Sequence, residues 1–478
     1  MIEAIIGLEV HVELNTQSKL FCSCSTRFGA AANSQVCPVC LGMPGTVPVL
    51  NKTAVEKAIL ASLCLDCTIA RMGGFDRKNY FYPDMPKSYQ ISQVFDPIGQ
   101  EGGLEIDTPD GKKRIRIRQV HLEEDAGKLV HEGETITTAK GSLVDLNRAG
   151  APLIEIVSHP DLRNMDEAVS YLENLRSILR YGDISECRME EGSFRCDGNI
   201  SVREMGSETF NPKVEIKNMN SLKALHKALS YEIRRQSSLL EQSKRVDQET
   251  RTWDEQQEIT VSMRSKEHPD YRVYPEPELG YIEVSDDWLA EIRTRIPELP
   301  QAKKQRYMKE WGLSEYDAHQ LSRDQDLAQY FEKTVSFYQE PKRISNWIQA
   351  ELIRLLNQEP KTIAESPVQP PQLAELVAMV DRGEISGKMG KEVLEGMYAE
   401  GKEAEEIIRS RGLRQISDDS ELEKLAERVI ADNPKPVEDY RKGKMKAMGF
   451  LVGQMMKATR GQANPEKANE IIKKVLDK

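Results

Sequence analysis

The hydrophobic pattern of the chain changes near Pro297, and this change constrains the fold more than any other feature. Before it, apolar and polar residues alternate in several segments, including 7–14, 114–121, 195–203 and 213–217, as half-buried strands require. After it, apolar residues recur at helical spacing in consecutive segments. The sequence therefore predicts a sheet-rich N-terminal part followed by an all-α part.

Helical patterns are predicted in both parts. In the first part we expect helices at 53–64, 166–180 and 221–241, the second of them with Asn164 as its N-cap. A proline-rich break at 366–371 separates two groups of helices in the second part. The helices expected there are 301–312, 314–322, 324–338, 342–356, 371–382, 387–400, 420–431, 437–459 and 465–476.

The charge composition argues against attraction of the whole chain to nucleic acid, because 66 basic residues face 77 acidic ones. Basic residues nevertheless outnumber acidic ones over 431–478, so any contact with a phosphate backbone should be local. No apolar run approaches the ~18 residues of a membrane span. The N-terminus has the pattern of a strand and lacks the basic start of a signal peptide. We therefore expect a cytoplasmic protein that is not embedded in a membrane.

Two tight cysteine pairs indicate a metal centre. Cys22 and Cys24 precede Cys37 and Cys40 by a short ribbon at 20–42, and this spacing is typical of a tetrahedral four-thiolate zinc site. Four sulfur ligands leave no open coordination position, so the zinc would be architectural. An alternative pairs Cys37 and Cys40 with the cysteines at 64 and 67, but those follow a helical pattern and should pack as small hydrophobic residues.

Acidic residues and histidine recur in the predicted strands. In 7–14, Glu9, His11 and Glu13 share one face, which would give half of a site for a hard divalent cation. The acidic run at 123–125 could complete it, although such runs are more often solvated turns. Glu155 lies in an otherwise apolar strand and needs a cation. These residues could meet in one pocket; otherwise each is the polar face of a half-exposed strand.

The segment 77–93 combines aromatic rings, cations and two prolines without helical or strand periodicity. Such a segment suits a loop that wraps a ligand, with rings against a base and cations against phosphates; the alternative is an ordered surface loop. In 195–203 the polar residues alternate with apolar ones and could meet a phosphate and its metal. The three residues of this strand expected at a ligand are Arg195, Asp197 and Asn199.

Nucleotide-binding glycine motifs are absent from the sequence. The glycines and lysine at 383–388 do not have P-loop spacing, and no Rossmann fingerprint follows a predicted strand. There is also no nucleophile elbow and no serine-rich amidase signature. A chain of this kind that uses ATP would have to bind it on a sheet face.

Long, distinctive motifs occur throughout the chain: GLEVHVEL, FDRKNYFYPDMPKSYQISQ, HLEEDAGK, DLNRAGAPLIEIVS, SFRCDGNISVR, KVEIKNMNS, ETRTWDE and GFLVGQMMKATRGQANP. Together they resemble the motifs of the GatB family, which belongs to the bacterial aspartyl/glutamyl-tRNA amidotransferases. The archaeal GatE relatives carry an inserted domain for which this chain is too short. The resemblance implies an α+β cradle like that of glutamine synthetase and guanido kinases at 1–295, a helical domain at 296–405 and a YqeY-like tail domain at 406–478.

The resemblance also implies an activity. The side-chain carboxylate of a glutamate or aspartate mischarged on tRNA-Gln or tRNA-Asn would be phosphorylated by ATP, and ammonia would then displace the phosphate. Ammonia would come from a glutaminase subunit, and a third, small subunit would complete a heterotrimer; a non-discriminating aminoacyl-tRNA synthetase is a further possible partner. A rival hypothesis is a zinc-stabilised RNA-binding or assembly subunit without catalysis, but such a surface should not gather carboxylates.

By the same resemblance, individual residues acquire expected roles. Lys78 would act with four magnesium ligands: Glu9, His11, Glu124 and Glu155. Three cations would meet the phosphates: Arg77, Lys78 and Lys87. Three tyrosines would shape the nucleotide or the aminoacyl end: Tyr80, Tyr82 and Tyr89. Five basic residues would touch the tRNA backbone or, alternatively, form a solvated helix face: Lys442, Lys444, Lys446, Lys457 and Arg460.

Overall fold

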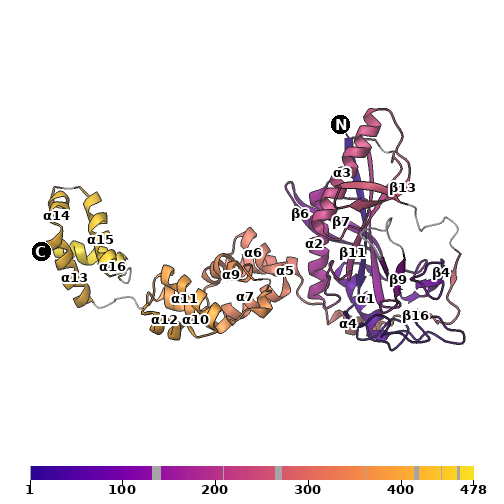
Figure 1. Ribbon diagram of the computed structural model, residues 1–478, viewed down its shortest axis with the longest axis horizontal. Helices are drawn as coiled ribbons and strands as arrows, with labels where there is room; N and C mark the ends of the chain where they lie inside the picture. The colour runs from indigo at the N-terminus through magenta and orange to yellow at the C-terminus, as the bar shows by residue number, and fades with distance from the viewer. Residues whose placement is uncertain are drawn as a thin grey trace. The chain divides into compact units, whose positions relative to one another are not determined.

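A computed structural model describes the chain except for residues 1, 132–140, 208, 264–271, 360, 414–418, 443, 460–462, 464 and 478. The chain divides into two compact units, Met1–Pro300 and Gln301–Lys478, and each is described by itself. Every described strand lies in the first unit, which confirms the predicted change from sheet to helix (Figure 1).

The first unit is built on a 12-stranded sheet. Its main path runs β14-β13-β12-β11-β1-β10-β7-β5-β4-β15, with β6 beside β7 and β2 beside β6. Two further sheets of two strands each, β16-β3 and β8-β9, lie outside this sheet. The strands are β1 (Ile2–Glu13), β2 (Thr68–Ile69), β3 (Met72–Gly73), β4 (Asp76–Asn79), β5 (Tyr89–Ser92), β6 (Gly99–Thr108), β7 (Gly111–Glu124), β8 (Lys128–His131), β9 (Ser142–Asp145), β10 (Pro152–Ser158), β11 (Phe194–Glu204), β12 (Val214–Lys217), β13 (Glu249–Asp254), β14 (Ile259–Met263), β15 (Val273–Pro275) and β16 (Ile282–Glu283).

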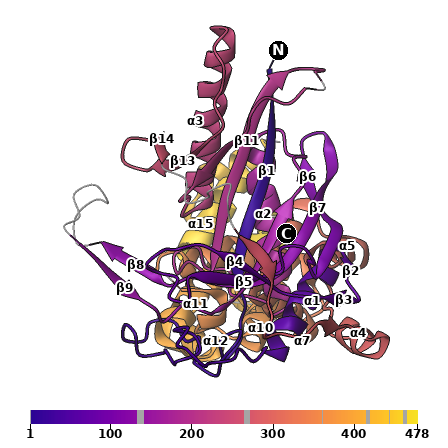
Figure 2. The ribbon, with the colours of Figure 1, turned by 90° about the vertical axis from the view of Figure 1, so that its right-hand side faces the viewer.

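Helices cover the apolar face of this sheet. Leu8, Val10 and Val12 of the central strand β1 are at most 1% exposed and belong to one core with residues of all four helices of the unit. Helix α3 contacts β11, and α1 and α2 contact β6 (Figure 2). The odd-numbered residues of β1 therefore face the other way, as the period-two pattern predicts. The helices of the unit are α1 (Lys52–Cys64), α2 (Met165–Tyr181), α3 (Leu222–Glu241) and α4 (Asp286–Arg293).

Polar side chains begin the three long helices. Asn164 accepts a hydrogen bond from the Glu167 amide at 2.8 Å, which confirms the predicted cap of α2. Asn51 and Ser221 cap α1 and α3 in the same way. Each such cap satisfies a backbone N–H that the helix leaves without a partner, and contributes about 1 kcal/mol.

The second unit is helical throughout its described part and contains two hydrophobic cores. One core extends from Tyr307 to Ile408, the other from Leu422 to Leu476. Among the described helices of the chain, none is long and apolar enough to span a membrane. The helices are α5 (Pro300–Trp311), α6 (Glu315–Ser322), α7 (Gln325–Phe337), α8 (Pro341–Asn346), η1 (Trp347–Leu352, a π-helical turn), α9 (Ile353–Leu356), η2 (Ile363–Glu365), α10 (Pro370–Asp381), α11 (Gly387–Glu400), α12 (Ala404–Arg411), α13 (Asp419–Asp432), α14 (Pro434–Arg441), α15 (Lys446–Ala458) and α16 (Pro465–Leu476).

Two of the helix predictions need correction. The single helix expected at 437–459 is two helices, because α14 ends at Arg441 and α15 begins at Lys446. Helices α4 and α12, of eight residues each, were not predicted.

Candidate active site and metal centres

Four strands bring polar side chains together on the open face of the sheet. His11 on β1 lies directly opposite Glu155 on β10 and Arg195 on β11, and Glu155 lies opposite His121 on β7. Directly opposite residues of antiparallel strands point to the same face. Residues that are more than 140 positions apart in the sequence therefore share one surface.

The centre of this face is a cluster of one imidazole and two carboxylates. His11 Nε2 lies 3.8 Å from Glu155 Oε2 and 4.0 Å from Glu123 Oε1. One ligand atom from each of these three residues lies within 4.8 Å of the others, as a bound ion requires. Ser92 Oγ donates a hydrogen bond to Glu123 Oε2 at 2.9 Å, which fixes that carboxylate. We call His11, Glu123 and Glu155 the front cluster.

The electrostatics of the front cluster suit a divalent cation. Burial lowers the pKa of His11 to about 3, with Arg195 adding to the effect, so the imidazole is neutral and able to coordinate. Burial raises the pKa of Glu123, and it raises that of Glu155 together with the charges of Glu123 and Glu9. Two carboxylates so placed repel each other until a cation neutralises them. The donor set of a neutral imidazole and two carboxylates fits Mg²⁺ or a similar ion.

Further charged groups surround the front cluster. Lys78 faces it from β4, since its charge acts on Glu123, Glu155 and His11. Glu9 shares the face but lies outside the set of three, and its Oε1 accepts a hydrogen bond from Asn199 Nδ2 at 2.8 Å. The structure therefore brings Lys78, Glu9 and Asn199 to the surface on which they were expected.

Two residues predicted on β11 take part in ion pairs beside the front cluster. Arg195 Nη2 donates to Asp125 Oδ2 at 2.9 Å. Asp197 Oδ2 lies 3.3 Å from Lys217 Nζ, and burial raises the pKa of Asp197 to about 6 despite that cation. Arg148 also reaches Asp125, at 3.3 Å. Three cationic side chains, Arg195, Arg148 and Lys217, thus lie beside the front cluster, each paired with a carboxylate. An anionic ligand there would compete with these carboxylates for the cations.

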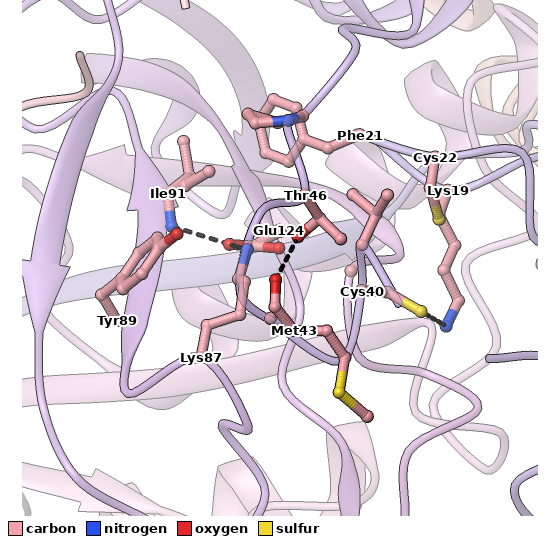
Figure 3. A pocket seen from close by; sticks show the side chains of 14 residues that line it. Lys19, Phe21, Cys22, Cys40, Met43, Thr46, Lys87, Tyr89, Ile91 and Glu124 are labelled. Carbon is pink, nitrogen blue, oxygen red and sulfur yellow. Dashed lines mark hydrogen bonds and ion pairs between the residues drawn. The ribbon is translucent and has the colours of Figure 1, made fainter. Parts of the chain in front are cut away.

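Glu124 does not join the front cluster, contrary to the sequence-based expectation. Adjacent residues of a strand point to opposite faces, so Glu124 lies behind β7 while Glu123 lies in front. There Glu124 is paired with Lys87 and accepts a hydrogen bond from the Ile91 amide at 2.9 Å. Both side chains are buried, and Figure 3 shows them beside Tyr89 and Ile91. Glu123, for which the sequence suggested no role of its own, takes the place expected for Glu124.

Arg77 and Tyr89 also lie behind the sheet. Arg77 makes a two-pronged ion pair with the buried Glu276, with N–O distances of 2.5 and 2.8 Å, and its guanidinium lies 4.3 Å from the centre of the Tyr89 ring. Lys87 lies 5.2 Å from the same ring. We call Arg77, Lys87, Tyr89, Glu124 and Glu276 the back cluster. The expected ligand-binding residues of segment 77–93 are thus divided between the two faces.

The loop between β4 and β5 carries the remaining aromatic residues of this segment. Burial raises the pKa of Tyr80, with Asp84, Glu123 and Asp125 contributing, so this tyrosine lies toward the front cluster. Tyr82 is 36% exposed and Phe81 is 85% exposed. Tyr80 is therefore the aromatic residue of this loop that lies toward the front cluster, while Phe81 is largely exposed to solvent.

Two cavities lie beside the front cluster and are lined by its neighbours, not by His11, Glu123 or Glu155 themselves. One, of about 630 Å³, includes Gly7, Glu9, Asn199 and Phe210 in its lining; we call it the Gly7 cavity. The other, of about 670 Å³, includes Glu13, Arg148, Arg195 and Asp197; we call it the Glu13 cavity. Because Glu9 and Glu13 flank His11 on the same strand face, the cavities lie on either side of the cluster.

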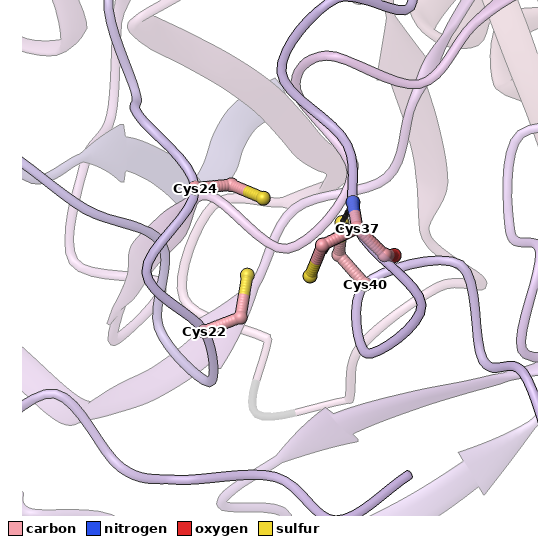
Figure 4. Close-up of side chains that lie close together, drawn as sticks. All are labelled: Cys22, Cys24, Cys37 and Cys40. Atoms are coloured by element: carbon pink, nitrogen blue, oxygen red, sulfur yellow. Dashed lines mark hydrogen bonds between the residues drawn. The ribbon is translucent and has the colours of Figure 1, made fainter.

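The four predicted zinc ligands meet in a separate centre. One sulfur atom from each of Cys22, Cys24, Cys37 and Cys40 lies within 4.8 Å of the others, and Cys37 Sγ and Cys40 Sγ are 3.9 Å apart (Figure 4). Tetrahedral zinc with four sulfur ligands places sulfur atoms about 3.8 Å from one another. The geometry therefore fits zinc. The alternative pairing is not formed, because the cysteines at 64 and 67 are buried in the hydrophobic core.

The predicted tRNA-contacting residues occupy the last part of the chain. Lys442 and Lys444 are exposed and lie 3.3 Å from Glu438 and 2.9 Å from Asp439. Lys446 and Lys457 are exposed on α15. Arg460 lies outside the described residues.

Known proteins resemble this chain over its whole length. Residues 4–290 match the family model described as GatB/GatE catalytic domain, and residues 329–476 match the Yqey-type model described as GatB domain. Relatives named as the B subunit of aspartyl/glutamyl-tRNA(Asn/Gln) amidotransferase are 55% identical in Carboxydothermus hydrogenoformans and 53% in Caldanaerobacter subterraneus subsp. tengcongensis. Each similarity covers 100% of this chain and 99% of the relative.

Proposed function

The chain belongs to the GatB family of tRNA-dependent amidotransferase subunits, and we propose that it carries the kinase and transamidase site of such an enzyme. The front cluster between two cavities is the observation that carries this proposal, because two substrates must meet at one cation. The enzyme would be a glutamine-hydrolysing, ATP-dependent carbon–nitrogen ligase acting in the cytoplasm.

The proposed reaction has two steps. In the first, a side-chain carboxylate oxygen of Glu-tRNA(Gln) or Asp-tRNA(Asn) attacks the γ-phosphorus of ATP, and ADP leaves. In the second, ammonia attacks the acyl carbon of the acyl phosphate and inorganic phosphate leaves, giving Gln-tRNA(Gln) or Asn-tRNA(Asn). Phosphorylation comes first because a free carboxylate is a poor electrophile, whereas phosphate is a good leaving group.

The side chains of the open face have separate proposed roles. His11, Glu123 and Glu155 would hold Mg²⁺, which neutralises phosphate charge and orients the phosphates. Lys78 would meet the transferred phosphate, and Arg195 could turn from Asp125 toward an anionic group. Tyr80 would exclude water from the reacting atoms. Asn199 would hold Glu9 at the mouth of the Gly7 cavity.

We do not assign a phosphate contact to Arg77 or Lys87. Each is engaged with a buried carboxylate behind the sheet, and freeing either one would leave a charge buried without its partner. Tyr89 packs against both cations and shares their structural role. Within segment 77–93, only Lys78 and Tyr80, which lie toward the front cluster, keep a proposed role at the ligand.

The proposed assembly follows from the family and from the composition. The sequence has no amidase signature, so ammonia would be delivered by a partner glutaminase within a heterotrimer that a third, small subunit completes. A non-discriminating aminoacyl-tRNA synthetase would be a further partner. Zinc in the four-cysteine centre would fix the ribbon beside the sheet. The exposed Lys442 and Lys444, which follow α14, and Lys446 and Lys457 on α15 would contact the tRNA backbone.

The experiment that tests this proposal supplies ammonium chloride in place of glutamine. Purified chain is mixed with mischarged Glu-tRNA(Gln) or Asp-tRNA(Asn), with and without ATP and Mg²⁺, and the amidated products are measured. We expect amidation that requires both ATP and Mg²⁺, and the preferred tRNA identifies the substrate. If tRNA binds but is not amidated even with the partner subunits present, the non-catalytic hypothesis replaces this one.

A further inference from the structure

Lys19 is a buried lysine next to the four-cysteine centre. It is 1% exposed, and its Nζ lies 3.6 Å from Cys40 Sγ and 3.4 Å from the carbonyl oxygen of Leu146. Figure 3 shows the ammonium directed at the Cys40 sulfur. The role of this residue was not anticipated from the sequence, and no step of the proposed reaction uses it.

Other buried lysines of the chain have a different kind of partner. Lys57 pairs with Asp183 at 3.2 Å, Lys87 with Glu124, and Lys303 with Glu332 at 2.6 Å. Among the described residues, no carboxylate lies within 4.0 Å of the Lys19 ammonium, and a thiol sulfur stands where the others have a carboxylate. A buried ammonium that lacks a negative partner is costly. The anion that balances Lys19 must therefore come from the cysteines.

Zinc bound by four thiolates provides that negative charge. The two charges of Zn²⁺ offset only two of the four thiolates, so the centre carries a net charge of −2, and a nearby cation offsets part of it. Groups that donate hydrogen bonds to metal ligands typically change metal affinity about 10–100-fold. We propose that Lys19 is the counter-ion of the four-cysteine centre and donates an N–H···S hydrogen bond to Cys40 that holds the metal in place.

Main-chain hydrogen bonds connect Lys19 to the end of strand β7, which carries Glu123. The Lys19 amide donates to the Cys24 carbonyl, the Leu20 amide to the Gly150 carbonyl, and the Gly150 amide to the Asp125 carbonyl, each at 2.9 Å. Gly150 has a φ of +86° and lies against Lys19 and Cys40, where a Cβ would be 3.6 Å from each. Main-chain hydrogen bonds thus fix the backbone of Lys19 beside the four-cysteine centre.

The inference rests on the proposed zinc site and is tested by metal release. The full-length chain is loaded with zinc, its metal content is measured by mass spectrometry, and release to the chelator 4-(2-pyridylazo)resorcinol is followed at fixed pH. Lys19→Met should release zinc about 10–100-fold faster than the unchanged chain. Lys19→Arg should stay close to the unchanged rate, and Lys19→Gln, which keeps a donor but no charge, should fall between them.

Lys57→Met is the matched control, because Lys57 is also buried but contacts Asp183. Its zinc release should equal that of the unchanged chain. Equal release by Lys57→Met and Lys19→Met would overturn the counter-ion role and leave the zinc site standing. If Lys19→Met does not fold, Lys19→Gln decides: release no faster than that of Lys19→Arg overturns the role. Absence of zinc from the unchanged chain would overturn both the zinc site and the role of Lys19.

Discussion

Glu123 and Glu124 are neighbours on one strand, yet they belong to different parts of the molecule. Glu123 faces His11 and Glu155 in the front cluster, between two cavities, and burial together with the charge of Asp125 raises its pKa although Lys78 and Arg195 act against this. Glu124 faces backward to Lys87 and to the ribbon that carries the cysteines. The comparison teaches that identical side chains one residue apart can serve binding in one case and stability in the other.

The two clusters also differ in how their charges are balanced. In the back cluster each buried carboxylate has a cation of the chain: Lys87 for Glu124 and Arg77 for Glu276. In the front cluster burial raises the pKa of both carboxyl groups, which marks charge that the chain does not fully balance. We therefore expect the front cluster to bind an added divalent cation and the back cluster not to bind one.

Removing the back carboxylate gives the largest expected effect, and it is an effect on stability. Glu124→Gln leaves the Lys87 ammonium buried without its partner, which should lower the free energy of unfolding by about 3–5 kcal/mol. Urea denaturation followed by circular dichroism measures this. The double variant Glu124→Gln with Lys87→Met should recover much of the loss, and a double variant no more stable than the single one would contradict the pairing.

Removing the front carboxylate should act on the rate. Glu123→Gln takes a charge from the proposed magnesium site, and we expect ATP-dependent amidation to fall about 10²–10³-fold, as for the loss of one transition-state contact. Initial rates with ammonium chloride and saturating mischarged tRNA provide the measurement. The urea midpoint of the variant is its control and should stay near that of the unchanged chain. Unimpaired turnover would remove Glu123 from the site.

Lys78 and Lys87 allow the same comparison of the two sheet faces to be made with positively charged side chains. Lys78 faces the front cluster, so Lys78→Ala should reduce kcat/KM for ATP about 10–100-fold, the value of one charge-assisted contact. Lys87→Ala should instead lower the denaturation midpoint, since it leaves the buried Glu124 unpaired. Steady-state kinetics and urea denaturation are run on both variants. A loss of stability in Lys78→Ala together with a loss of kcat/KM in Lys87→Ala would contradict our assignment of Lys78 to the front face and Lys87 to the back face.

The smallest expected effect lies outside both clusters and serves as a reference. Lys457→Ala on α15 removes one exposed positive charge, so tRNA affinity should weaken uniformly and the slope of log K against log salt should decrease by about 1. Filter binding at several salt concentrations measures it, with Lys388→Ala on α11 as a matched surface lysine. An unchanged slope would identify α15 as a solvated helix face.

Much of the front face could be predicted from period-two alternation. That alternation puts Glu9 and His11 on one side of β1 and places Arg195, Asp197 and Asn199 together on β11, as the structure shows. Glu124 was expected at the site from the family resemblance, and alternation was not followed beyond residue 121. On β7 the buried residues change from odd-numbered, at Ile117, to even-numbered, at Val120. The register with β10 shifts at the same place. With the apolar Leu122 as a guide, Glu124 could have been assigned to the buried face and Glu123 to the open one.

The back cluster could not have been found from the sequence. Arg77 and Glu276 are 199 residues apart. The residues next to Arg77 in the sequence do not show whether its guanidinium binds a ligand or pairs with a carboxylate of the chain. The four-cysteine centre was predictable because its spacing is local and its sulfur ligands are uncommon. The break between α14 and α15 was missed because apolar spacing continues across it.

Direct cation binding tests the central claim, which is that the front cluster is the metal site. The full-length chain and its Glu123→Gln and Glu124→Gln variants are titrated with Mn²⁺ as a paramagnetic substitute for Mg²⁺, in the presence of ATP, and free Mn²⁺ is read by electron paramagnetic resonance. We predict that Glu123→Gln weakens binding at least about 10-fold, whereas folded Glu124→Gln binds like the unchanged chain. Loss of binding in Glu124→Gln with full binding in Glu123→Gln would contradict the account.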